Sequence, residues 1–266
     1  MSLSVVIIAR NEEKLIGEAI ESAKFADEVL VLDTGSTDKT AAVAKKAGAR
    51  VIKRPTKGLA FARWRTEAIK EVRGDWIFYL DADERITPEL KSEILQIVSH
   101  SLSHTGCVHS DTPGVSMAYA VPRENYYLGR RVRWGGAWPD YVKRLFWKKA
   151  LKKWTGRLHE EPVFEGKLTH LRNPIRHYTH RDLTSMVAKT IEWSKLEAEE
   201  LYRAHHPPVT WWRILRIMLT ELWQRGIRKQ GFRDGTVGVI EVIFQVFSRF
   251  ITYARLWEIQ IKNSKS

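Results

Sequence analysis

Apolar runs and helical periodicities alternate along the first hundred residues of this chain. Runs rich in β-branched residues predict buried strands at 3–9, 28–33, 49–54 and 75–81. Between these runs apolar residues recur three or four positions apart, which predicts helices after Asn11, over 36–48, over 58–74 and from Pro88. This alternation predicts an α/β fold with a doubly wound, mostly parallel sheet covered by helices on both faces.

Beyond the first hundred residues the pattern of apolar and polar positions changes twice. Residues 99–118 are polar and aperiodic and predict a surface loop, whereas alternating segments at 119–125, 141–149, 162–166 and 174–180 predict further strands. Helical periodicity runs from Leu183 to Arg203, breaks at Pro207-Pro208 and continues to about Lys262. We therefore expect an α/β domain over 1–182, made of halves at 1–98 and 119–182, and a C-terminal helical extension over 183–266.

Positive charge and tryptophan are concentrated beyond the first hundred residues. Residues 1–100 contain 16 Lys or Arg and 16 Asp or Glu, whereas residues 101–266 contain 28 and 15, so the net charge of +13 comes from the second part. Nine of the eleven tryptophans lie there as well. This combination suits nucleic acid, an anionic membrane surface or an acidic lipid-linked substrate. The single cysteine, Cys107, excludes an internal disulfide and suits a reducing compartment.

Residues 210–229 predict a strongly amphipathic helix. Trp211, Leu215, Leu219 and Leu222 share one face, and arginine lies at its margins. We expect part of this surface to pack on the last helix and part to contact a membrane interface. No run of about 18 uncharged apolar residues occurs and the start lacks signal-peptide features, so we expect neither a spanning helix nor a signal peptide. Nucleic-acid-binding fingerprints are absent from the sequence, and we expect no nucleic-acid partner.

Polar side chains follow the predicted strands at the point where each strand ends. Residues 10–12 follow the first strand, Asp33 ends the second, and Asp81 and Asp83 follow the fourth. Because ligands of open parallel sheets bind beyond the carboxyl ends of the strands, we expect these groups to converge. A divalent cation would offset their mutual repulsion, and carboxylates suit Mg²⁺ or Mn²⁺ bound to a diphosphate.

Four stretches carry a resemblance to a known family. G-x-G-x-x-G and P-loop motifs are absent, and the single DTG at 33–35 argues against an aspartic protease, which needs two. Instead VVIIARNEE, DTGSTDKT, GLAFAR and YLDADE resemble the family 2 glycosyltransferases of the GT-A fold. The likeness is greatest to the branch that contains the bacterial lipopolysaccharide core β-1,4-glucosyltransferases. It covers residues 3 to about 98 and continues more weakly to about residue 180.

The resemblance implies a nucleotide-sugar site and a metal site. Residues 10–12 would line the base and ribose pocket, Asp33 would accept a hydrogen bond from the uracil or ribose, and Arg63 would face the diphosphate. Asp81 would approach the ribose or a metal-bound water, and Asp83 would ligate Mg²⁺ or Mn²⁺. The predicted nucleotide-sugar residues are Ala9, Arg10, Asn11, Glu12, Asp33, Arg63, Asp81, Ala82 and Asp83, and the predicted metal ligands are Asp83 and Asp81.

A second set of residues is predicted to complete the site. Transfer to an acceptor hydroxyl needs a carboxylate that removes its proton. Glu160 in GRLHEEP and Asp140 in WPDYVKR are the candidates, with a slight preference for Glu160. His159 or His177 could complete the metal shell, although a histidine is more often structural.

The resemblance leads to an expected function. We expect an inverting, metal-dependent hexosyltransferase that moves a sugar from a UDP-sugar, with UDP-glucose favoured, to a glycolipid, with the lipopolysaccharide inner core favoured. The alternatives are transfer to a polyprenyl phosphate or a protein, and a non-catalytic module that binds a nucleotide or glycan. We expect the protein in the cytoplasm, attached to the inner face of the cell membrane. The sequence leaves open the sugar, the acceptor and the oligomeric state.

Overall fold

The computed structural model describes residues 1–54, 61–100, 116–156 and 160–264. The chain forms two compact units, each described here by itself. The α/β unit comprises residues 1–123 and 141–177, and the helical unit comprises residues 124–140 and 178–266. A segment between two strands of the sheet thus belongs with the C-terminal helices. The predicted division of the chain after residue 182 into independent domains stays a prediction.

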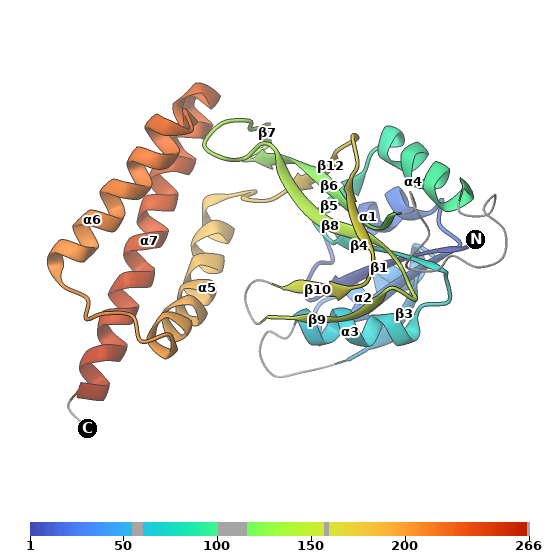
Figure 1. Ribbon diagram of the computed structural model, residues 1–266, viewed down its shortest axis with the longest axis horizontal. Helices are drawn as coiled ribbons and strands as arrows, with labels where there is room; N and C mark the ends of the chain where they lie inside the picture. Colours follow the sequence, from blue (N-terminus) through green and yellow to red (C-terminus); the bar gives the residue numbers. More distant parts are fainter. Residues whose placement is uncertain (55–60, 101–115, 157–159, 265–266) are drawn as a thin grey trace. The chain divides into compact units, whose positions relative to one another are not determined.

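The α/β unit is built on a mixed, mostly parallel sheet (Figure 1). Its strands are β1 (Leu3–Ala9), β2 (Glu28–Asp33), β3 (Arg50–Lys53), β4 (Trp76–Asp81), β5 (Glu84–Ile86), β6 (Ser116–Tyr127), β8 (Asp140–Trp147), β9 (Leu151–Thr155), β10 (Glu161–Phe164), β11 (Lys167–His170) and β12 (Ile175–Tyr178). The order is β3-β2-β1-β4-β8-β6-β12-β5, and β3, β2, β1 and β4 are mutually parallel. Strand β8 joins β4 antiparallel, β11 joins β6 parallel, and β9 pairs with β10 separately.

Helices cover both faces of the parallel strands. They are α1 (Ile16–Ala23), α2 (Thr40–Lys46), α3 (Phe61–Glu71) and α4 (Pro88–His100). Because successive side chains of a strand point to opposite faces, the side chains of β1 belong to two hydrophobic cores, one on each face of the sheet. Val5 and Ile7 pack with buried residues of α1, α2 and α4, whereas Val6 packs with buried residues of α3. The predicted α/β class with helices on both faces is therefore confirmed.

The local predictions agree with the structure in most of the α/β unit. All four strands predicted in the first hundred residues are present, and a short fifth strand, β5, joins them. Thr87 caps α4, because its Oγ1 accepts a hydrogen bond from the Leu90 N–H at 3.2 Å. The prediction that Asn11 caps the first helix is wrong. Asn11 lies in the left-handed region with φ 56°, and α1 begins only at Ile16. Most of the predicted loop over 99–118 lies outside the described residues.

The helical unit contains the C-terminal helices and a short hairpin. Its elements are β7 (Arg130–Arg131), which pairs with the end of β6, α5 (Leu183–Arg203), α6 (Trp211–Glu221), the π-helical turn η1 (Leu222–Arg228), the 3₁₀ turn η2 (Gly231–Asp234) and α7 (Gly235–Ser264). Helix α7 packs against both α5 and α6 (Figure 1). Ala198 and Leu256 are fully buried where α5 meets α7. The predicted helix over 183–203 and the break at Pro207-Pro208 are confirmed.

One helical segment is long and apolar enough to cross a membrane by length and composition. It runs over Gly231–Ser264, its most apolar 18-residue stretch has a mean hydropathy of 1.4, and 22% of that stretch is buried. The expectation that no segment of this chain could span a bilayer was therefore too strong. A helix that packs on two neighbours can pass the same test, and α7 has two such neighbours.

Candidate active site

Two loops that follow β1 and β2 meet at the carboxyl edge of the sheet. The Asn11 N–H donates to Ser36 Oγ at 3.0 Å, and Asn11 Oδ1 accepts from the Thr37 N–H at 2.8 Å. The Glu12 N–H donates to Thr40 Oγ1 at 2.7 Å. Residues 10–12 and the DTGST stretch are thus brought together, as predicted. The exposed Arg10 lies at the start of this contact.

Asp33 is buried and forms part of a turn. It is 2% exposed, and its Oδ1 accepts hydrogen bonds from the N–H groups of Gly35 at 3.2 Å and Ser36 at 2.8 Å. Asp33 pairs in register with Ala9, whereas Asp81 pairs with Ile8. Because Ile8 and Ala9 are consecutive, the two aspartates leave the sheet on opposite faces. The predicted convergence of Asp33 and Asp81 is therefore found for the ends of their strands and not for the two side chains.

Asp81, at the end of β4, lies between two guanidinium groups. Its Oδ1 accepts a hydrogen bond from Arg65 Nη2 at 3.2 Å, and its Oδ2 is paired with Arg144 Nη2. Arg144 is also paired with Glu84, whose Oε2 accepts a hydrogen bond from the Asp81 N–H at 3.0 Å. The Arg144 and Glu84 side chains are 3% and 0% exposed. These four residues form one ionic network, in which Arg144 and Glu84 are buried and the Asp81 side chain is 35% exposed towards the cleft.

The network holds Asp81 in its charged form. Burial disfavours the carboxylate, but the positive charges of Arg144 and Arg65 outweigh burial and hold the pKa of Asp81 well below its usual range. Burial likewise works against a charged Arg144, while Asp81 and Glu84 raise its pKa above the usual value. Both oxygens of Asp81 are engaged with guanidinium groups. The role of Asp81 as a metal ligand therefore stays a prediction, and it would require these contacts to change.

Asp83 and His177 form a pair whose chemistry fits a divalent cation. Asp83 Oδ2 lies 3.5 Å from His177 Nε2, and the two side chains are 25% and 12% exposed. They lie side by side because β12 pairs with β5, which places His177 opposite Glu84. In the part of the chain that the structure describes, no group of three or more His, Cys, Asp or Glu side chains is placed to hold a metal. A two-residue set suits a cation that takes its other ligands from phosphate and water.

Glu160 lies in a cleft beside the ionic network. Burial raises the pKa of Glu160, and although Arg65 lowers it, the net pKa is above that of an ordinary glutamate. The nearby negative charge of Asp81 also raises the pKa of Glu160. The cleft has an empty volume of about 620 Å³, including space open to solvent, and its lining includes Arg65, Asp81, Arg123, Arg144, Trp154 and Glu160. The structure thus places one of the two predicted bases beside Asp81.

The other predicted residues lie elsewhere or outside the described chain. Asp140 belongs to the helical unit, where Asn125 Nδ2 donates to its Oδ2 at 3.4 Å. Arg63 is 67% exposed and paired with Glu67 at 2.8 Å, so this position does not support its predicted role at the diphosphate. Ala9 and Ala82 are buried at 2% and 5% exposure. His159 lies outside the described residues.

Three site residues were missed by the sequence predictions: Arg65, Glu84 and Arg144. Arg65 is nearly buried, and its guanidinium lies 4.8 Å from the centre of the Trp154 ring. A signal existed, because Arg65 precedes Ala68 by three residues and Val72 by seven, which places it on the apolar side of α3. Arg63 instead precedes Glu67 by four residues, the spacing of an exposed ion pair.

The cleft, its acid and its cations lie at the carboxyl edge of a mostly parallel α/β sheet, the edge at which nucleotide-binding α/β proteins hold their ligands. The family described as Glycosyl transferase family 2 matches residues 4–155, more than half of the chain. The chain belongs to this family and is a nucleotide-sugar glycosyltransferase with a GT-A fold, as the resemblance predicted.

Comparison with individual proteins gives distant similarities, two of which run along almost the whole chain. An uncharacterized glycosyltransferase of Rickettsia bellii is 28% identical over 98% of this chain and 87% of that protein. The lipopolysaccharide core biosynthesis glycosyltransferase LpsC of Rhizobium meliloti is 25% identical over 97% and 93%. The structure of glucosyl-3-phosphoglycerate synthase from Mycobacterium tuberculosis, in complex with Mn²⁺ and UDP-glucose, is 20% identical with a TM-score of 0.46, covering 77% of this chain and 80% of that chain.

Proposed function

We propose that this glycosyltransferase moves a hexose, with inversion and with a metal cofactor, from a UDP-sugar to a glycolipid acceptor. UDP-glucose is the favoured donor, and the lipopolysaccharide inner core is the favoured acceptor. The observation that carries the proposal is the placement of Glu160, whose pKa is raised, in the same cleft as Asp81, Arg65 and Arg144. The cleft offers a base and cationic groups within one space, as a displacement at an anomeric carbon requires.

The chain supplies the base and the electrostatic environment of the transfer. Glu160 would accept the proton of the acceptor hydroxyl while the oxygen of that hydroxyl forms a bond to the anomeric carbon. The bond from that carbon to the phosphate oxygen breaks, and its electron pair leaves with UDP. A single displacement inverts the anomeric centre. Arg65 and Arg123, which line the cleft, would place positive charge beside the leaving diphosphate, and Arg144 would hold Asp81 in place.

Asp83 and His177 are the residues that would hold the cation. A carboxylate oxygen and an imidazole nitrogen are ligands that Mg²⁺ or Mn²⁺ accepts alongside phosphate oxygens and water. When bound, such a cation would supply positive charge at the diphosphate. This assignment moves the metal site from the predicted pair of Asp83 and Asp81 to Asp83 and His177, which lie 3.5 Å apart.

A glycolipid acceptor is supported by similarity and by an exposed apolar surface. The Rhizobium meliloti relative, which is similar along 97% of this chain, is a lipopolysaccharide core biosynthesis glycosyltransferase. Within the helical unit, Trp211 is 76% exposed, Leu219 52% and Trp223 62%. We infer from this face that the protein is peripheral on the inner surface of the cell membrane, with α6 in the interface. Of the 22 large apolar side chains exposed in the described part of the chain, 14 lie within residues 211–257.

The proposed function is tested by UDP release from UDP-glucose in the presence and absence of Mn²⁺. We expect release to need the cation and to fall by more than about 100-fold in Asp83→Asn and in His177→Ala, because each loses a ligand. Glu89→Gln, an exposed acid of α4, is the control and should match the wild type. Absence of release with UDP-glucose, UDP-galactose and their N-acetyl forms, together with thermal stabilisation by UDP, would instead indicate a binding module.

A further inference from the structure

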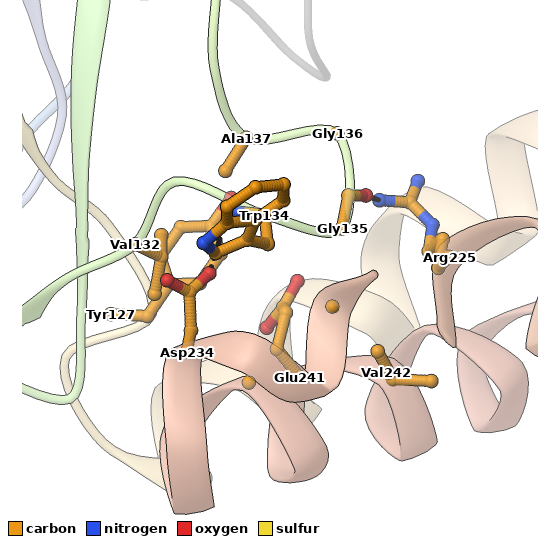
Figure 2. A pocket seen from close by; sticks show the side chains of 12 residues that line it. Tyr127, Val132, Trp134, Gly135, Gly136, Ala137, Arg225, Asp234, Glu241 and Val242 are labelled. Atoms are coloured by element: carbon orange, nitrogen blue, oxygen red, sulfur yellow. Dashed lines mark hydrogen bonds between the residues drawn. The ribbon is translucent and has the colours of Figure 1, made fainter. Parts of the chain in front are cut away.

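Two carboxylates of the C-terminal helices fix the segment 124–140 within the helical unit (Figure 2). Asp234 Oδ2 accepts hydrogen bonds from the N–H groups of Arg133 at 3.0 Å and Trp134 at 2.7 Å. Glu241 is paired with His180 Nδ1 at 2.9 Å, and the His180 carbonyl accepts a hydrogen bond from the Leu128 N–H at 2.9 Å. The loop that carries Trp134 is therefore held in one defined arrangement on η2 and α7.

Backbone contacts bring this loop against the turn that precedes α7. The Gly135 N–H donates to the Lys229 carbonyl at 2.8 Å, and Arg225 Nη1 donates to the Gly135 carbonyl at 3.4 Å. Figure 2 shows the Arg225 side chain directed at Gly135. A Cβ added at Gly231 would lie 3.3 Å from Gly135 Cα and 2.6 Å from Val242 Cγ2, so only glycine permits this approach.

Cationic side chains surround the exposed tryptophan of the loop. The Arg233 guanidinium lies 4.3 Å from the centre of the Trp134 ring, and Trp134 is 38% exposed. The Lys229 side chain crosses Gly136, because its Nζ is 2.8 Å from where a Cβ of residue 136 would lie. Arg133 and Lys229 are exposed, and neither is in an ion pair among the described residues. Arg133, Lys229 and Arg233 are three cations against the one carboxylate of Asp234, so the cluster keeps a net positive charge.

This arrangement suits a ligand that combines phosphate with a sugar ring. Arginine and lysine bind phosphate oxygens through charge-assisted hydrogen bonds. The indole ring offers a rigid apolar surface, on which the C–H face of a sugar can pack. The same unit carries the exposed apolar face of α6 and η1, which fits the acyl part of a lipid. A lipid phosphate without a sugar would account for the cations, but it would offer no ring to pack on the fixed Trp134 side chain.

We propose that Arg133, Trp134, Lys229 and Arg233 form a binding site for the phosphorylated sugar headgroup of a membrane glycolipid. The proposal rests on the proposed function and deepens it, since it names the chemistry of the acceptor. The headgroup is held by residues of the helical unit alone, and Asp234 is a positioning residue that acts through the loop.

Vesicle flotation of the full chain tests the site with three lipid compositions. The vesicles contain phosphatidylcholine alone, phosphatidylcholine with phosphatidylglycerol, or phosphatidylcholine with lipid A, a phosphorylated disaccharide lipid, at equal surface charge. We expect the wild type to bind lipid A vesicles at least about 10-fold more tightly than phosphatidylglycerol vesicles, a difference of about 1.4 kcal/mol. Arg133→Glu combined with Lys229→Glu should reduce this ratio to about one.

The control carries the same change of charge elsewhere on the unit. Lys189→Glu combined with Lys195→Glu alters two exposed lysines of α5 and should keep the preference for lipid A. The neutral pair Arg133→Gln and Lys229→Gln repeats the test with less effect on folding and should also lose the preference. The proposal is overturned if the wild type shows no preference, if both charge-reversed pairs retain it, or if both lose it equally. Flotation needs neither the sugar donor nor the cation. If the protein prefers lipid A vesicles but releases no UDP, the proposed function is overturned and the proposed headgroup site is not.

Discussion

The pH dependence of transfer is expected to follow the titration of Glu160. Glu160→Gln should lower kcat by roughly 10²–10⁴-fold, since the amide cannot accept the acceptor proton. The base must be a carboxylate, and burial raises the pKa of Glu160. Activity should therefore fall as the pH drops through a value above that of an ordinary glutamate. A pH profile of kcat/KM for UDP release with acceptor measures this acid limb.

Two neighbouring variants distinguish this role from alternatives. Glu161 is 65% exposed and paired with Lys143, so Glu161→Gln should leave both the rate and the profile unchanged. Asp140→Asn tests the second candidate base. Loss of the acid limb in Asp140→Asn with its retention in Glu160→Gln would assign the base to Asp140.

The ionic network around Arg144 is expected to matter for stability as well. Arg144→Met leaves the Asp81 and Glu84 carboxylates without their shared partner, which should cost about 3–5 kcal/mol because Arg144 is 3% exposed. Arg54→Met, which removes a 41% exposed partner of Glu71, should cost about 0–1 kcal/mol. Urea unfolding at pH 7 measures both values. A similar small loss in the two variants would mean that the network adds no stability.

The same network predicts how stability changes with acid. The pKa of Asp81 is lower in the folded protein than in the unfolded chain. Its contribution is therefore complete above the unfolded value of about 3.9 and is lost as the pH falls from there towards the folded value. The stability difference between wild type and Arg144→Met should accordingly shrink below about pH 4.

Single residues could be predicted only where the sequence fixes the direction of the side chain. Asp81 and Asp83 stand out because they lie one residue apart directly at the end of an apolar run. Arg63 and Arg65 are both basic and two positions apart on one helix, and only the apolar neighbours Ala68 and Val72 show which one is buried. Pairing of β12 with β5 brings His177 to Asp83, and that contact depends on a register that no local pattern contains.

At the scale of elements, the exposed face of α6 carries the next prediction. Leu215 and Leu219 are 40% and 52% exposed. Leu215→Asp combined with Leu219→Asp should therefore abolish vesicle flotation with little effect on thermal unfolding, because each change places a charge in the lipid interface. Thr220→Asp combined with Gln224→Asp adds the same charge on the polar face and should bind more strongly than the leucine pair. Equal binding by the two double variants would exclude α6 as the contact.

Strong local patterns predicted elements, and weak patterns did not. The continuous apolar runs of β1, β2 and β4 and the Thr87 cap of α4 specify those elements locally. Strand β5 is three residues long, and β9 and β11 contain lysines, so none of them has a clear alternation of apolar and polar residues. Asn11 is a candidate helix cap by sequence because it precedes a helical spacing of apolar residues. Its side chain instead bonds to Thr37 in the neighbouring loop, a partner 26 residues away.

At the scale of the whole molecule, the net charge is shared by the two units. Residues 124–140 and 178–266 contain 17 Lys or Arg and 11 Asp or Glu, so the helical unit accounts for only part of the charge of +13. The concentration of positive charge after residue 100 therefore does not coincide with the C-terminal helices. The sequence could not show this, because segment 124–140 joins the helices through contacts that reach 101 residues along the chain.

The composition of the helical unit predicts the outcome of truncation. A chain ending at residue 182 lacks Val237, which packs with the buried Val132 and Ala137. It also lacks Asp234, the acceptor of two backbone N–H groups. We expect this chain to unfold at a lower temperature than the full chain and to bind a dye for exposed apolar surface. An unchanged unfolding midpoint would show that residues 1–182 are an independent domain.

The shared core of segment 124–140 and the C-terminal helices constrains how this protein can diverge. Exchange of residues 178–266 for another tail would require replacement of residues 124–140 as well. Substitutions at Asp234 and Glu241 should therefore be accompanied, in related sequences, by changes near Trp134 and His180. A chimaera that grafts both segments together should fold, whereas one that grafts either alone should not.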